Sequence, residues 1–130
     1  MRRKVWVIPT PFLPKSIERA NLTRVEEAAK KNLRLLKDNQ ARIAFGSDAY
    51  GSTPVEYVNY IASLGVFSNL EMLKIWCERT PQTIFPNRKI GRLKENYEAS
   101  FIVLGGNPLE NFGQVKNIKS KFKQGYILTP

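Results

Sequence analysis

The chain has 130 residues, of which 42% are hydrophobic and 11% aromatic, so one domain with a packed core is expected and wholesale disorder is excluded. Lys and Arg number 21 against 11 Asp and Glu, a net charge of +10, which is compatible with non-specific attraction to polyanions. No apolar run approaches the ~18 residues of a membrane span, the first run is too short for a signal peptide, and a single cysteine excludes an internal disulfide, so a cytoplasmic protein is predicted.

Two absences restrict the chemistry. The sequence contains no histidine, and its only aspartates are Asp38 and Asp48. A His-based catalytic triad, a His general base and any His-containing metal site are therefore excluded within one chain.

The first third of the chain predicts a strand followed by a helix. Residues 4–8 are a compact apolar run closed by Pro9, which is typical of a short buried strand. Thr23 and Glu26 form a capping box, and apolar residues at helical spacing follow. We therefore expect a helix that begins at Thr23 and ends near Asn39.

A second short strand leads to the candidate site. Apolar and other side chains alternate in residues 41–46, so this strand would deliver Asp48 to its carboxyl end. Thr53 as N-cap, Pro54 at the first helical position and Glu56 three residues after the cap then predict the start of another helix. In α/β folds such a strand–loop–helix junction is where ligands bind.

More helix is predicted up to residue 85. Gly65 is placed as the C-cap of the preceding helix, and a third capping box at 68–71 opens the next one. Thr80 and Pro81 are expected to restart a short helical turn. Cys77 lies on the apolar face of this pattern and is predicted to belong to the core. Trp6 and Trp76 are predicted to serve packing and not to form platforms for a ligand.

Alternation of strands and helices over residues 1–86 favours a parallel sheet built from βα units. Two strands are too few for such a sheet to stand alone, which indicates part of a larger architecture. Residues 87–130 differ in character. They predict strands at 98–104, 115–122 and 126–128, with lysines on one face of the second strand. This would be a small antiparallel β module.

Five motifs occur in a fixed order along the chain. They are Phe45-Gly-Ser-Asp-Ala49, Thr80-Pro81, the run from Gly91 to Leu104, Asn107-Pro-Leu109 and Phe122-Lys-Gln-Gly125. In this order they resemble the carboxyl-terminal part of the amidohydrolase superfamily, and most closely its imidazolonepropionase-like metal-dependent hydrolases. The resemblance covers nearly the whole chain.

The resemblance implies a fold and a site. Residues 1–86 would be the last βα units of a (β/α)₈ barrel, with 4–8 as the seventh strand, and 87–130 would form a small β-sandwich-like module. Asp48 matches the aspartate after the eighth strand, which in that family is a metal ligand and the proton acceptor for the attacking water. The implied cofactor is a divalent metal, with zinc favoured, and the implied reaction is hydrolysis of an amide or cyclic amide C–N bond.

One departure from the family is severe. Its other ligands are a His-x-His on the first strand, a later lysine or glutamate, and two further histidines, none of which is present here. A catalytic zinc takes about three protein ligands plus water. The resemblance therefore implies a carboxyl-terminal fragment that binds no metal and is inactive as an isolated chain.

Alternatives remain open at this point. Asp48 could simply be a loop or cap residue that hydrogen-bonds its own backbone. The basic charge could support a binding or structural role with non-specific nucleic-acid affinity, although no nucleic-acid motif accompanies it. Open strand edges predict a homo-oligomer, or a partner chain that supplies the missing barrel strands.

Overall fold

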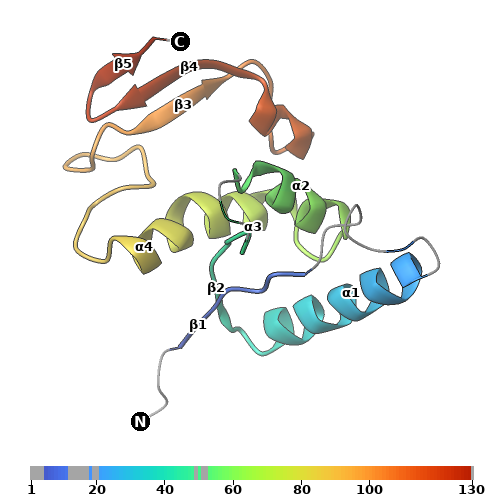
Figure 1. The fold of residues 1–130 in the computed structure, drawn as a ribbon. Coiled ribbons are helices and arrows are strands. Elements are labelled where there is room, and N and C mark those ends of the chain that lie inside the picture. The colour runs from blue at the N-terminus through green and yellow to red at the C-terminus, as the bar shows by residue number, and fades with distance from the viewer. Residues whose placement is uncertain (1–4, 12–17, 19–20, 49, 51–52, 130) are drawn as a thin grey trace. The chain divides into compact units, whose positions relative to one another are not determined.

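The computed structural model describes residues 5–11, 18, 21–48, 50 and 53–129. The described chain is a mixed α/β protein with two compact units, Met1–Ser68 and Asn69–Pro130 (Figure 1). The mixed α/β class agrees with the sequence, whereas the barrel segment and the division after residue 86 stay predictions. None of the helices in these ranges combines the length and apolarity needed to cross a membrane.

The first unit contains a short parallel strand pair. β1 (Trp6–Val7) and β2 (Arg42–Ile43) pair in parallel, with Trp6 opposite Arg42 and Val7 opposite Ile43. The Ala44 N–H donates to the Val7 carbonyl at 3.1 Å and continues the ladder beyond β2. Both predicted strands are therefore present, each shorter than expected, and the connection between them contains a helix, as parallel pairing requires.

That helix, α1 (Leu22–Asp38), buries Ala29 and Leu33. The predicted end near Asn39 is confirmed, but the predicted start at Thr23 is wrong. Asn21 is the N-cap residue, and its N–H already donates to the Glu18 carbonyl at 2.9 Å. Because the chain is turning before Thr23, the capping box has no helix start to cap.

The second helix of this unit, α2 (Val55–Ser63), begins one residue later than predicted, with Pro54 and not Thr53 at the N-cap. Its end is confirmed, because Gly65 follows the C-cap with φ +67°, a left-handed conformation that glycine adopts without steric cost. The core of the first unit consists of Ala29, Leu33, Ile43, Ala44, Phe45, Tyr57, Val58, Tyr60, Ile61, Leu64, Val66 and Phe67.

The second unit opens with one continuous helical segment. α3 (Asn69–Leu73) begins directly after Ser68, as its capping box predicts, and leads into a π-helical turn (Lys74–Arg79) and then α4 (Thr80–Ile84) (Figure 1). Hydrogen bonding to the fifth residue back, in place of the fourth, changes which side chains share a face within the π turn. The prediction that Cys77 belongs to the core is wrong, because the residues that this segment buries lie on another face and Cys77 is exposed.

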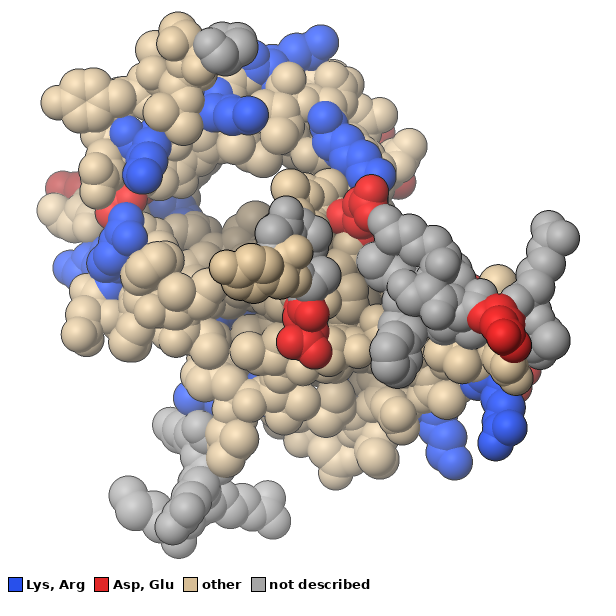
Figure 2. Space-filling model, viewed as in Figure 1, with Lys and Arg blue, Asp and Glu red and all other residues tan. Residues whose placement is uncertain are grey.

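A three-stranded antiparallel sheet completes the second unit. β3 (Phe101–Leu104), β4 (Ile118–Lys123) and β5 (Tyr126–Leu128) lie in that order. The rings of Phe101 and Phe122 stack with centroids 4.6 Å apart across β3 and β4. Exposed lysines alternate with half-buried Ser120 and Phe122 along β4, which confirms the predicted period of two. Figure 2 shows Lys and Arg side chains gathered over this sheet, at the top of the view.

The strand predicted at 115–122 begins late. A 3-10 helix (Phe112–Lys116) precedes β4 and buries Phe112 and Val115, which are three residues apart. The Asn111 side chain caps this helix by accepting from the Gly113 N–H at 2.9 Å. Val115 is therefore buried as part of a 3-10 helix, in which residues three apart share a face. The predicted strand included this residue and so began three residues too early.

Candidate functional site

The candidate site lies where the two parallel strands end. β1 runs on into Ile8 and Pro9, and β2 into the loop that carries Asp48. The segments that follow the two strands lie close together. A Cβ added to Gly46 would lie only 3.0 Å from Cγ2 of Ile8. The prediction that Asp48 follows a strand and precedes a helix is therefore met at the carboxyl edge of a parallel pair.

Asp48 is an exposed residue with an unusual backbone. Its φ is +50°, in the left-handed region, which non-glycine residues enter at a steric cost. Aspartate is among the few residues that tolerate this conformation. The loop therefore holds an exposed carboxylate at the strand end in a conformation that other residue types would adopt with difficulty.

A buried tyrosine joins α2, the helix after this loop, to the end of β1. Tyr57 in α2 is 2% exposed, and its hydroxyl donates a hydrogen bond to the carbonyl of Pro9. Burial, and after it the neighbouring Tyr60 and Asp48, raise the pKa of Tyr57. Tyr57 therefore stays a protonated donor, and the carboxylate of Asp48 is close enough to influence its ionisation.

The residues present do not by themselves fit a metal centre. Within the described ranges no group of three or more His, Cys, Asp or Glu side chains is placed to hold a metal ion. Asp48 would supply one carboxylate, whereas a catalytic zinc site uses about three protein ligands. The role of Asp48 as ligand and catalytic residue thus stays a prediction that needs groups from elsewhere.

The two tryptophans considered in the sequence analysis are not part of the candidate site. Trp6 packs in β1 with the Arg42 guanidinium 5.5 Å above its ring, which agrees with a packing role. Trp76 is half-buried within the π-helical turn. Sequence reasoning missed Tyr57, because a tyrosine on the buried face of a helix gives no sign of the distant carbonyl to which its hydroxyl donates.

Comparison with known proteins gives structural but not sequence matches. No family model matches the chain, and no curated protein matches it. A prolidase crystallised with N-methylphosphonate-L-proline superposes with a TM-score of 0.77 at 20% identity over 97% of this chain. The ochratoxinase of A. niger superposes with 0.68 at 26% identity over 83%, and a Xaa-Pro dipeptidase with bound methionine with 0.68 at 21% over 86%.

The similarity to these structures is one of fold, and it agrees in part with the resemblance found in the sequence. The chain spans 35%, 26% and 28% of the lengths of the prolidase, ochratoxinase and dipeptidase chains respectively. These superpositions show a shared fold over 83–97% of this chain and 26–35% of each neighbour.

Proposed function

We propose that this chain is the part of a metal-dependent amidohydrolase that carries one catalytic carboxylate, Asp48, and that it acts on an amide or cyclic amide C–N bond only together with other polypeptide. The observation that carries the proposal is the position of Asp48 at the carboxyl end of a strand paired in parallel with its neighbour. The superposition on a prolidase, an ochratoxinase and a dipeptidase supports the reaction class.

The absence of histidine limits the metal binding that the chain can achieve alone. Because the sequence has no histidine, its own side chains offer only oxygen, sulfur and amine ligands. We propose that the remaining metal ligands, and hence the zinc or other divalent ion, come with a partner that supplies the rest of the barrel. In that assembly Asp48 would be one ligand and would accept the proton of the attacking water.

The test uses the two aspartates of the chain as a matched pair. The purified chain, supplied with Zn²⁺, Co²⁺ or Mn²⁺, is assayed on Xaa-Pro dipeptides and N-acyl amino acids, first alone and then in the complex isolated from its native cells. We expect turnover only in the complex. Asp48→Asn should lower that turnover at least about 100-fold, as loss of an acid–base group does, and Asp38→Asn should leave it unchanged.

Two results would contradict the proposal. One is metal-dependent turnover by the chain alone that Asp48→Asn does not affect. The other is an active complex whose rate is equally insensitive to both substitutions.

A second candidate function rests on the lysines of β4. Lys119, Lys121 and Lys123 are exposed along one strand of a chain with net charge +10. Such a row attracts polyanions, and the attraction weakens as salt screens it. Retention on heparin that Lys119→Gln with Lys121→Gln lowers would support this function, whereas retention unchanged by the double substitution would argue against it.

A further inference from the structure

The π-helical turn of the second unit has a local cause. Pro81 has no N–H, and in an ordinary α-helix its ring would clash with the carbonyl of Cys77, four residues earlier. The helix instead widens into a π-helical turn. The N–H and the hydroxyl of Thr80 both donate to the carbonyl of Ile75, five residues earlier, the hydroxyl at 2.8 Å. Single π-helical turns of this kind occur frequently at functional sites.

The widened turn receives a second segment of chain. Gly91, with φ +88°, packs its backbone on the carbonyl of Cys77 so closely that an added Cβ would lie 1.9 Å from the oxygen. The next residue, Arg92, is thereby held beside the helix. Its guanidinium donates to the carboxylate of Glu78 at 2.7 Å.

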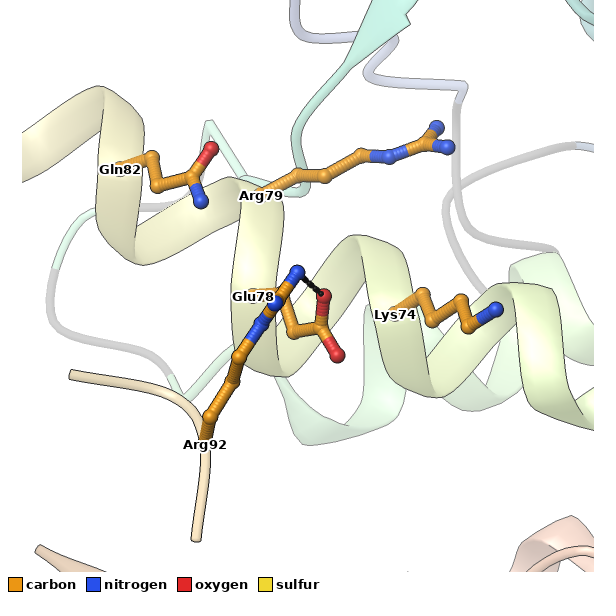
Figure 3. A pocket seen from close by; sticks show the side chains of 5 residues that line it. All are labelled: Lys74, Glu78, Arg79, Gln82 and Arg92. Atoms are coloured by element: carbon orange, nitrogen blue, oxygen red, sulfur yellow. Dashed lines mark hydrogen bonds and ion pairs between the residues drawn. The ribbon is translucent and has the colours of Figure 1, made fainter. Parts of the chain in front are cut away.

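These contacts shape an open pocket of about 560 Å³ in the second unit (Figure 3). Its lining is Lys74, Glu78, Arg79, Gln82 and Arg92. Lys74 and Arg79 would lie about 140° apart around an α-helix, and π spacing brings residues five apart towards one face. In Figure 3 both side chains extend to the right, Arg79 above the helix and Lys74 in front of it.

The charge of the pocket is unbalanced. Three of its five lining residues are cationic and one is acidic, and that acid, Glu78, is already paired with Arg92. Within the described ranges neither Lys74 nor Arg79 makes an ion pair. Like charges held together on one face repel one another, so an anion that neutralises them would be stabilised there.

We propose that this pocket binds the phosphate group of a small organic phosphomonoester. Guanidinium groups match phosphate oxygens in a bidentate fork, and a lysine adds a compact point charge. The amide of Gln82 can donate a further hydrogen bond. The volume lies in the ~300–1,000 Å³ range of small-molecule sites and exceeds what a bare phosphate ion needs, which leaves room for an organic part.

Glu78 sets the strength of this site. Its carboxylate competes with phosphate for the guanidinium of Arg92, because one fork cannot engage both fully. Replacing Glu78 by glutamine removes the competitor and raises the positive charge of the pocket. The inference does not depend on the proposed hydrolase function, since none of these residues belongs to the Asp48 loop.

The experiment titrates the full chain with inorganic phosphate and with glycerol 3-phosphate, at constant ionic strength set with chloride, and follows amide NMR shifts of residues 74–82. Acetate at the same ionic strength tests whether any anion suffices. Arg79→Gln should weaken phosphate binding about tenfold, the loss of one charge-assisted contact, and Glu78→Gln should tighten it several-fold. Lys116→Gln, which removes one exposed charge from the 3-10 helix outside the pocket lining, is the matched control and should change the affinity less than about twofold.

Tighter binding of glycerol 3-phosphate than of phosphate, and of phosphate than of acetate, would support the phosphomonoester. Equal weakening by Arg79→Gln and Lys116→Gln would overturn the proposal, because binding would then follow net charge alone. Absence of shifts in residues 74–82, or weaker binding in the Glu78→Gln variant, would overturn it as well.

Discussion

Two tyrosines one turn apart in α2 have opposite hydrogen-bonding environments. The hydroxyl of Tyr57 is buried and donates to the Pro9 carbonyl. The hydroxyl of Tyr60 is also buried, and within the described part of the chain it has no hydrogen-bond partner. A satisfied buried polar group stabilises a fold modestly, whereas an unsatisfied one costs its full desolvation.

The same substitution should therefore act differently at the two positions. Tyr57→Phe should lower the free energy of unfolding by about 1 kcal/mol, because the Pro9 carbonyl loses its donor. Tyr60→Phe should be neutral or stabilising, since it removes a hydroxyl that gains nothing from burial. Urea unfolding followed by tryptophan fluorescence measures both. A larger loss at Tyr60 than at Tyr57 would contradict this assignment.

A surface carboxyl gives the stability a pH dependence. Glu98 accepts from Arg88 at 2.6 and 2.7 Å, and this pair, followed by the hydroxyl of Ser100, holds the pKa of Glu98 below its ordinary value of 4.5. A lowered pKa in the folded state stabilises the protein above the ordinary value, and this contribution is lost as pH falls through the lowered one.

Glu98→Gln should accordingly be less stable than the parent protein at pH 7, and the difference should shrink as pH falls below 4.5. Glu95→Gln, an exposed carboxyl in the same connecting segment, is the control and should not reproduce this pattern. Urea-unfolding midpoints between pH 7 and pH 3 provide the measurement. A stability gap independent of pH would mean that the ion pair does not contribute.

At the scale of elements, the helical segment from α3 to α4 depends on a contact made far along the chain. Gly91 and Gly125 both have positive φ, +88° and +84°, so an alanine is strained at either position. They differ in surroundings. An added Cβ would collide with the carbonyl of Cys77 at Gly91 and would meet nothing within 4 Å at Gly125.

This difference predicts unequal costs for the same change. Gly125→Ala should destabilise by about 1 kcal/mol, the conformational penalty alone. Gly91→Ala should cost clearly more, because the backbone must also move off the π-helical turn and take Arg92 with it. Thermal or urea unfolding distinguishes the two, and equal costs would show that the contact with Cys77 is not needed for the fold.

At the scale of the whole molecule, apolar edges remain exposed. β5 forms one edge of the antiparallel sheet, and its Tyr126, Ile127 and Leu128 are 77%, 60% and 48% exposed. Unpaired edge strands with apolar side chains template pairing with another chain. We propose that the isolated protein self-associates through this edge.

Light scattering tests the proposal directly. The purified chain should have the mass of a dimer or a larger assembly, and Ile127→Lys should lower that mass by placing a charge on the pairing edge. Leu35→Lys, on an equally exposed position of α1, should leave it unchanged. A monodisperse monomer would contradict the proposed self-association.

Local pattern was sufficient for much of the fold. Periodicity in the sequence predicted the helices of the first unit, the lysine face of β4 and the place of Asp48 after a strand, because each depends on residues a few positions apart. Capping boxes were less reliable, since a turn already under way, as at Asn21, moves the start of a helix.

Only the tertiary structure decided which distant groups meet. The hydrogen bond from Tyr57 to Pro9 spans 48 residues, and the approach of Gly91 to Cys77 sets Arg92 beside Glu78. Cys77 is exposed because packing in the second unit buries another face of this helical segment than the one that the sequence indicated. Sequence by itself determined the elements and the residue types available for chemistry. Contacts between distant residues depend on how segments far apart in the chain pack together, and the local periodicity of the sequence does not encode this packing.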